Sequence, residues 1–490
     1  MLGTKTKKAA RPDQGQTEIA QRVRTLADQA FSRAAGAPLI EGNRVRRLRN
    51  AAENYPAWLE AIRGARRHVH FENYIIQDDA AGKMFAEALL EKAQDGVAVR
   101  VIYDWLGAVG KTSGGFWSRL RAGGVDVRCY NPPRFDSPLG WLSRDHRKTL
   151  AVDGEVGFVA GLCVGQQWLG FPEKKIDPWR DTGVEVRGPA VVDIERAFAT
   201  VWSMLGEALP ADEILDASAA AASQGPTSVR IVATEPSTSR AFRLDQLFAS
   251  FARQRVWLTD AYYAGTATYV QGLTTAARQG VDVRILLPGV TDLPMVRSLS
   301  RSGYKPLLEC GVRIFEWNGP MLHAKSAVVD SRWSRVGSTN LNLASWLGNC
   351  EMDAVIEDAD FARQMEEMYL QDLANATEVV LNQKRKVRAP KSKEQKEKIA
   401  RGRGSASRAA VGAARIGHAV GAAIADRRTI EPLESRLMVI TGLILLPLAV
   451  LFAIFPAALA YPLVAILTWI ALALLIRGWK ARRKRLERGE

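Results

Sequence analysis

The stretch HRKTLAVD at residues 146–153 returns as HAKSAVVD at residues 323–330, so the pattern H-x-K-x4-D occurs twice. The two copies use two of the chain's five histidines. Side chains alternate along a strand, so the lysine two residues after each histidine is expected on the same side of the strand. Imidazole suits proton transfer near neutral pH, and a lysine ammonium binds a phosphate oxygen. Either copy alone would indicate only a buried core histidine, but the matched pair predicts one histidine for each side of a phosphodiester.

The sequence around the motifs repeats as well. Residues 96–100 (GVAVR) match residues 280–284 (GVDVR), and residues 124–127 (GVDV) match residues 311–314 (GVRI). These near-constant offsets indicate two homologous halves. In each half the alternation of strand and helix signals predicts an α/β fold in which a β-sheet is flanked by helices. The predicted elements are strands over 68–74, 99–103, 256–263 and 283–287 and helices over 82–93 and 268–278.

Together these features resemble the phospholipase D superfamily, and the flanking residues resemble those of bacterial cardiolipin synthases. The resemblance covers roughly residues 40–380 and implies two phospholipase D-type halves. Besides the two motifs, it rests on residues 71–75, 78–82, 103–107, 144–146, 179–182 and 188–191 in the first half and on residues 287–289, Asp292, 337–340 and 349–351 in the second.

The motif residues are the candidate catalytic groups. Lys148 and Lys325 are expected to neutralise the phosphodiester oxygens. Neutral His146 is expected to attack phosphorus and form a phosphohistidine, while His323 protonates the leaving alkoxide and later deprotonates the acceptor. The resemblance puts the nucleophile in the first half, but the residues alone allow the two roles to be exchanged. The candidates are His146, Lys148, Asp153, His323, Lys325 and Asp330, of which the two aspartates are expected to brace the ends of the motif strands.

The resemblance also implies a carboxylate downstream of each histidine. Such a group holds the imidazole in one tautomer and stabilises its cation. The matching positions are Asp181, which follows His146 by 35 residues, and Glu351, which follows His323 by 28 residues.

Phosphate contacts are implied at two further positions. Ser338 and Asn340 resemble the phosphate-binding pair of the family, whereas Cys163 stands in the first half where the family has an asparagine. No metal site and no cofactor are predicted, because the four cysteines are scattered without C-x-x-C spacing and no cluster has the ligand spacing of a zinc site.

The net charge of +15 is concentrated near the C-terminus. Residues 384–428 carry 14 Lys and Arg against 3 Asp and Glu, and residues 477–490 carry 7 against 2, so the rest of the chain is close to neutral. A nucleic-acid groove would need positive charge on the catalytic halves, so nucleic acid is not expected as a partner. The basic segment is instead expected to be a linker that attracts anionic lipid.

Residues 437–476 contain no charged side chain. One membrane-spanning helix needs about 20 apolar residues, so a transmembrane hairpin is predicted, with its basic flanks and the catalytic halves on the cytoplasmic face of the bacterial inner membrane. The N-terminus lacks the apolar run of a signal peptide. The predicted division is an N-terminal extension (1–40), two catalytic halves (41–210 and 226–380), the linker (384–430), the hairpin (437–476) and a basic tail (477–490).

The predicted function is that of a membrane-bound phosphatidyltransferase acting on phospholipid. Cardiolipin synthesis from two phosphatidylglycerol molecules is the leading reaction. A hydrolase that uses water as acceptor and releases phosphatidic acid is the alternative, with a nuclease a distant third. Both active-site halves lie in one chain, so an oligomer is not required for catalysis.

Overall fold

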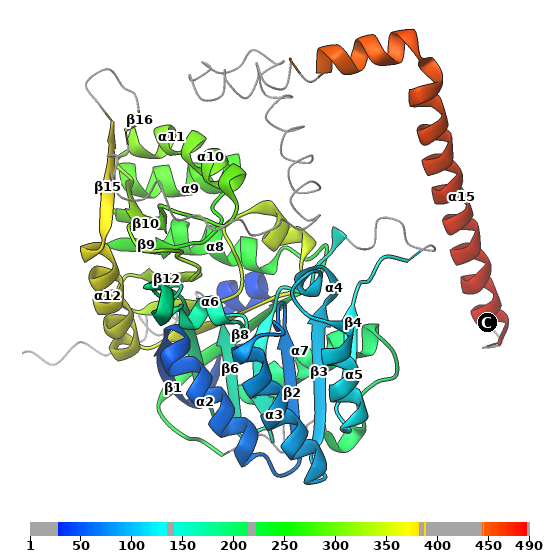
Figure 1. Cartoon of the computed structure of the whole chain (residues 1–490). Helices are drawn as coiled ribbons and strands as arrows, with labels where there is room; N and C mark the ends of the chain where they lie inside the picture. The colour runs from blue at the N-terminus through cyan, green and yellow to red at the C-terminus, as the bar shows by residue number, and fades with distance from the viewer. Residues whose placement is uncertain are drawn as a thin grey trace, which may run out of the picture.

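The computed structural model describes residues 28–134, 142–213, 222–381, 387–388, 443 and 445–487. Residues 1–27 of the predicted N-terminal extension, most of the predicted linker, residues 437–442 and 444 of the predicted hairpin and residues 488–490 of the predicted basic tail lie outside the described part. Figure 1 shows helices packed around a large sheet, with helix α15 (Pro456–Glu487) standing apart from this body.

In the described residues, sixteen strands form a single sheet that runs through both halves. The seven strands of the first half have the order β1-β7-β6-β5-β2-β3-β4, and the seven of the second half repeat it as β8-β14-β13-β12-β9-β10-β11. β1 and β8 pair antiparallel where the halves meet, so the two predicted sheets are joined into one. β15 and β16 extend the outer edge of the second half.

The strand bounds follow the repeat. The first half contains β1 (Ile40–Arg49), β2 (His68–Asn73), β3 (Ala98–Asp104), β4 (Asp126–Tyr130), β5 (Lys148–Val152), β6 (Val156–Ala160) and β7 (Thr182–Arg187). The second contains β8 (Thr227–Thr234), β9 (Arg255–Thr259), β10 (Asp282–Pro288), β11 (Arg313–Trp317), β12 (Ser326–Val329), β13 (Trp333–Gly337) and β14 (Glu351–Glu357), followed by β15 (Ala376–Leu381) and β16 (Val387–Arg388).

The helices lie between these strands. They are α2 (Asn50–Gly64), α3 (Ala80–Gln94), α4 (Trp105–Ala108), α5 (Gly114–Ala122), α6 (Gln166–Leu169), α7 (Val191–Met204), α8 (Arg240–Phe251), α9 (Ala267–Arg278), α10 (Pro294–Ser302), α11 (Tyr304–Leu308) and α12 (Ala359–Ala374), with short 3-10 turns at Pro172–Lys174 and Ala211–Glu213 and a π-helical turn at Ala344–Gly348.

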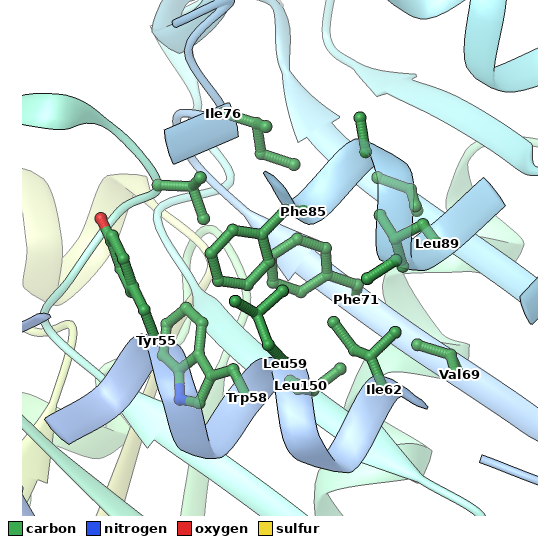
Figure 2. Packing of buried hydrophobic residues seen from close by; sticks show 14 of the residues in the cluster. Tyr55, Trp58, Leu59, Ile62, Val69, Phe71, Ile76, Phe85, Leu89 and Leu150 are labelled. Carbon is green, nitrogen blue, oxygen red and sulfur yellow. The ribbon is translucent and has the colours of Figure 1, made fainter. Parts of the chain in front are cut away.

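An aromatic core holds α2 and α3 against the first half of the sheet (Figure 2). Trp58 of α2 lies edge-on to Phe71 of β2 and to Phe85 of α3, with ring centroids 6.2 and 6.1 Å apart. Edge-to-face pairs of this kind add to the stabilisation that comes from burial. Asp79 caps the start of α3 by accepting a hydrogen bond from the N–H of Gly82 at 3.0 Å. The first half therefore presents a rigid β2 next to the motif strand β5.

A second core is shared by the two halves. It combines residues of β5 to β7 and α7 with residues of β8, β12 to β14 and α12, among them Val184, Ile194, Ile231, Val336 and Met365. Because apolar burial across this junction is continuous, the two motif strands are held in one fixed relation.

Part of the predicted N-terminal extension belongs to the second half. Residues 28–35 are helical, and Phe31 packs its ring 5.5 Å from that of Phe248 and 5.8 Å from that of Trp333. Asp28 also pairs with Arg230 of β8 at 2.6 Å. This segment therefore stabilises the fold of the second half.

The described C-terminal residues do not form the predicted hairpin of two spanning helices. Residues 445–454 are helical, but residues 437–442 and 444 of the first predicted span lie outside the described residues. α15 then continues through Arg477 and Lys480, so the second apolar stretch and the basic tail share one helix. In the part of the chain that the structure describes, no helix combines the length and the apolarity of a membrane span.

Candidate active site

The two motifs meet where the halves join. His146 precedes β5 and donates its backbone N–H to the carbonyl of Cys350 at 2.9 Å, and His323 precedes β12 and donates its backbone N–H to the carbonyl of Arg180 at 2.7 Å. Each motif histidine is thus tied to the backbone of the opposite half, immediately before that half's candidate carboxylate. The site exists only when both halves are folded together.

The carboxylates are exchanged between the halves. Nδ1 of His146 lies 2.9 Å from Oε2 of Glu351, and Nδ1 of His323 lies 2.7 Å from Oδ2 of Asp181. The expectation that each histidine is held by the carboxylate of its own half is therefore wrong. The cause is the pair of backbone bridges, which put residue 351 beside the first motif and residue 181 beside the second. With Nδ1–H donated to a carboxylate, Nε2 of each ring is the nitrogen left for chemistry.

The carboxylates are themselves held by donors. Oδ2 of Asp181 also accepts from the indole N–H of Trp168 at 3.1 Å, and its Oδ1 accepts from the backbone N–H of Thr182 at 2.9 Å. Oε1 of Glu351 accepts from the side-chain amide of Asn349 at 3.1 Å. Both carboxylates are fully buried, so these bonds fix their orientation.

Lys148 and Lys325 are completely buried in the same site. Each ammonium donates to the backbone carbonyl of its own motif histidine. Nζ of Lys325 also lies 3.0 Å from Nδ1 of His323, but that nitrogen donates its proton to Asp181, so the ammonium lies beside the ring without bonding to it. The pKa of Lys325 is lowered to about 8, mainly by burial and also by the charge of Lys148, although the charge of Asp181 acts in the opposite direction. The two ammonium groups repel each other, as expected of a site that binds an anion.

Both histidines are neutral at physiological pH. Burial lowers the pKa of His146 to about 4 and that of His323 to about 3, although the facing carboxylates act in the opposite direction. Burial alone would raise the pKa values of Glu351 and Asp181, but the neighbouring histidines and lysines lower them. At neutral pH the site therefore holds carboxylate anions, ammonium cations and imidazoles with a free lone pair.

The low pKa of His146 predicts a specific acid sensitivity. Unfolded histidine binds a proton near pH 6.5 and folded His146 only near pH 4, so the free energy of unfolding should fall as pH drops through this window. In His146→Asn the slope of the free energy of unfolding against pH should decrease by up to about 1.4 kcal/mol per pH unit, the value for one proton. Urea unfolding of both proteins between these pH values measures the difference. Equal slopes would show that His146 is not buried in its neutral form.

Aromatic rings surround the histidines unequally. Tyr74 packs edge-on to His146 with centroids 5.1 Å apart, and Tyr262 packs edge-on to His323 at 5.8 Å. Only His323 has two further rings, Trp168 at 5.6 Å and Trp179 at 5.8 Å, among the described residues. Sequence reasoning did not assign these residues to the site. For Tyr74 and Tyr262 the available signal was their position shortly after β2 and β9, the strands that pair with the motif strands.

Asp153 and Asp330 lie at the far ends of the motif strands. The Asp153 carboxylate accepts from the backbone N–H groups of Arg66, Arg67 and His68 at 2.8 Å each. Asp330 does the same for residues 253–255 at 2.8 to 2.9 Å. β5 has five residues, so Asp153 lies about 16 Å along the strand from Lys148. The two aspartates hold the turns before β2 and β9 and do not face the reacting groups.

Removing this brace should affect stability more than chemistry. Asp153→Ala leaves three backbone donors without their carboxylate and is expected to lower the free energy of unfolding by about 2–4 kcal/mol. The turnover of molecules that remain folded should be nearly unchanged. Denaturant unfolding and an activity assay well below the melting temperature test this, with Asp330→Ala as the matched variant of the second half. Loss of activity at unchanged stability would instead place Asp153 in the chemistry.

The candidate phosphate-binding side chains differ in whether their polar groups already have hydrogen-bond partners in the fold. Ser338 accepts from the backbone N–H of Met352 at 2.9 Å, so its hydroxyl is already used by the fold. Oδ1 of buried Asn340 has no hydrogen-bond partner among the described residues. Cys163 is buried, which raises the pKa of its thiol, while the charges of Lys148 and nearby lysines lower it. The thiol therefore stays neutral and cannot replace an amide donor.

Comparisons with known proteins agree with this geometry. Residues 58–167 and 244–373 match the family described as "Cardiolipin synthase, PLD-like domain". The chain is 32% identical over 370 residues to cardiolipin synthase A of Pseudomonas syringae, with 74% of each chain covered. It is 34% identical over 338 residues to cardiolipin synthase 2 of Bacillus anthracis, covering 68% of this chain and 65% of that protein, just under two thirds of its length.

A solved structure shares the fold. The phosphatidylserine synthase of Haemophilus influenzae superposes with a TM-score of 0.56 at 15% identity, covering 72% of this chain and 91% of that one. At this identity the likeness concerns the fold alone.

Proposed function

Because the chain belongs to the cardiolipin synthase family of phospholipase D-like proteins, we propose that it is a phosphatidyltransferase that forms cardiolipin from two phosphatidylglycerol molecules and releases glycerol. The observation that supports this proposal most is the pair of neutral histidines, each held by the carboxylate of the opposite half, in one buried site with two lysines. Such a site has a nucleophile, an acid–base group and cations for a phosphodiester.

The reaction has two steps in this proposal. Nε2 of His146 attacks phosphorus, the bond from phosphorus to the glycerol oxygen breaks, and His323 supplies the proton that the departing oxygen needs. The bound phosphodiester is negatively charged, which raises the pKa of His323 toward the protonated form. In the second step His323 takes the proton of the acceptor hydroxyl, whose oxygen attacks phosphorus and releases His146. Glu351 stabilises the His146 cation, and Lys148 and Lys325 neutralise the phosphate oxygens.

Product identification tests the function. Full-length protein would be incubated with phosphatidylglycerol labelled in its headgroup and in its acyl chains. The proposal expects one glycerol released for each cardiolipin formed, and no product with a His146→Ala, His323→Ala double variant. Phosphatidic acid as the main lipid product would show that water is the acceptor and that the protein is a hydrolase.

We also propose that the C-terminal segment attaches the protein to a membrane, with the catalytic halves on its cytoplasmic side. The charge-free residues 437–476 support this, as do the large apolar side chains that α15 exposes, among them Leu463, Val464, Ile466 and Leu475. A soluble domain rarely exposes a continuous apolar surface of this size.

Deleting residues 430–490 should release the protein from the membrane. The deletion leaves both motifs and both carboxylates in place, so activity on detergent-dispersed lipid should persist. Without the apolar stretch, only basic residues attract anionic lipid, and salt screens that attraction. A wash in high salt followed by sedimentation measures attachment, with the full-length protein as the control. A truncated protein that stays bound at high salt would place the attachment elsewhere.

A further inference from the structure

A second cluster of ionisable side chains lies at the start of β2. His68 and His70 are two residues apart on one face of the strand, and Glu195 of α7 packs against them. One ligand atom from each residue lies within 4.8 Å of the others, and all three residues are buried. β2 advances about 3.3 Å per residue, so His70 lies about 13 Å along the chain from Tyr74, the residue that contacts His146. The proposed transfer reaction does not use this cluster.

The contacts within the cluster are incomplete. Nε2 of His68 lies 2.7 Å from Oε1 of Glu195, and the rings of His68 and His70 stack at 4.5 Å. The other face of His70 stacks on Phe198 at 4.7 Å, which fixes the ring plane. Nδ1 of His70 and Oε2 of Glu195 are buried without a hydrogen-bond partner among the described residues. Buried polar atoms normally have partners, so these two atoms indicate a missing ligand.

The charges of the cluster also leave room for a cation. Glu213 lies next to His70, with Oε2 3.5 Å from Nε2, but it forms two bonds of 2.5 Å with Arg100 and is neutralised by it. Glu195 is 1% exposed and has only His68 as a described hydrogen-bonding partner. The other carboxylate oxygen of this buried residue has no hydrogen-bond donor among the described residues, which is costly unless a cation or a donor binds there.

We propose that His68, His70 and Glu195 bind a divalent transition-metal ion, with zinc as the best match to the donor set. Two imidazole nitrogens and one carboxylate are a frequent zinc ligand set, whereas magnesium and calcium favour oxygen ligands alone. Glu213 is the nearest further carboxylate. The ion would tie β2 to α7 and so hold the strand that carries Tyr74 to the motif histidine. No metal site was predicted from the sequence because the H-x-H pair needs Glu195, 127 residues away from His68, to complete it.

The test uses the full-length protein, stripped with a chelator, dialysed and then titrated with zinc. About one equivalent should bind per chain, as a single preformed site requires, and should raise the melting temperature. His68→Asn and His70→Asn should each weaken zinc binding by at least 100-fold and abolish the thermal shift. His418→Asn removes the one histidine outside the two clusters and His146→Asn changes the catalytic pair, and both should bind zinc as the parent protein does.

Cobalt provides a readout that does not depend on the variants' folding. Cobalt(II) added to the stripped parent protein should produce the visible absorption of a four-coordinate ion, and zinc should displace it. Absence of a bound equivalent and of the cobalt spectrum in the parent protein would overturn the proposal. Zinc that is lost in His146→Asn but retained in His70→Asn would place the ion at the catalytic pair and would overturn it as well. Chelation should lower stability while phosphatidyl transfer continues.

Discussion

Replacing His146 or His323 with alanine is expected to lower kcat by at least about 10⁴-fold, the scale seen when a nucleophile or its acid–base partner is removed. The reason is geometric. Each histidine has its Nδ1 bound to a carboxylate and contributes a single Nε2 to one shared site. Initial rates on labelled phosphatidylglycerol in mixed micelles measure the effect, and the double variant should be hardly slower than either single one.

Thermal unfolding of the same variants serves as the control. Both alanine variants should remain folded, since the backbone bonds of His146 and His323 to the opposite half do not use the side chains. A folded variant with nearly normal turnover would refute a mechanism that needs both histidines.

Replacing the crossed carboxylates should have the second-largest effect. Glu351→Gln and Asp181→Asn keep the shape of each side chain but remove the negative charge that stabilises an imidazolium. The loss should be about 10²–10⁴-fold, because an amide can also impose the wrong imidazole tautomer. The crossing makes a sharper prediction: Asp181→Asn should behave like a variant of His323, and Glu351→Gln like a variant of His146.

A lipid substrate with an activated leaving group distinguishes the role of the His146–Glu351 pair from that of the His323–Asp181 pair. A phosphatidyl ester of p-nitrophenol expels p-nitrophenolate, which leaves without needing a proton. The loss in leaving-group expulsion that a His323 variant suffers should therefore largely disappear with this substrate. Asp181→Asn should then be rescued together with His323→Ala, while Glu351→Gln should stay slow together with His146→Ala. Rescue of Glu351→Gln together with His323→Ala would show that each carboxylate serves the histidine of its own half.

Much of the fold was predictable because the patterns that indicate each strand and helix are local in the sequence and occur in both halves. The strand over 68–74 and the helix over 268–278 agree with β2 and α9 to within one residue, and the family resemblance is confirmed. The strand over 256–263 ends earlier, at Thr259. Asp260 accepts from the backbone N–H groups of Leu341 and Tyr262, so the chain turns into the site at that point.

The crossing of the carboxylates could not be predicted in the same way. Glu351 is 205 residues from His146, and Asp181 is 142 residues from His323. The sequence near each histidine does not indicate which carboxylate will face it, because the order of the strands along the joined sheet decides that pairing. The additional tryptophans at His323 are equally non-local, since Trp168 and Trp179 come from the first half. Apart from Cys163, sequence symmetry therefore predicted a symmetric site, whereas the folded site is symmetric in its histidine–carboxylate pairs and lysines and asymmetric in its aromatic lining.

Trapping the covalent intermediate tests the central claim most directly. The enzyme would be mixed with labelled phosphatidylglycerol, quenched in denaturant at alkaline pH to preserve phosphohistidine, and digested for mass spectrometry. We predict a phosphatidyl adduct on His146 in the parent protein and no adduct in His146→Ala. In Asp181→Asn the adduct should accumulate when the p-nitrophenyl ester is the substrate, because its leaving group needs no proton while acceptor activation by His323 stays slow. An adduct on His323 would reverse the assigned roles, and turnover without an adduct on either histidine would contradict the covalent mechanism.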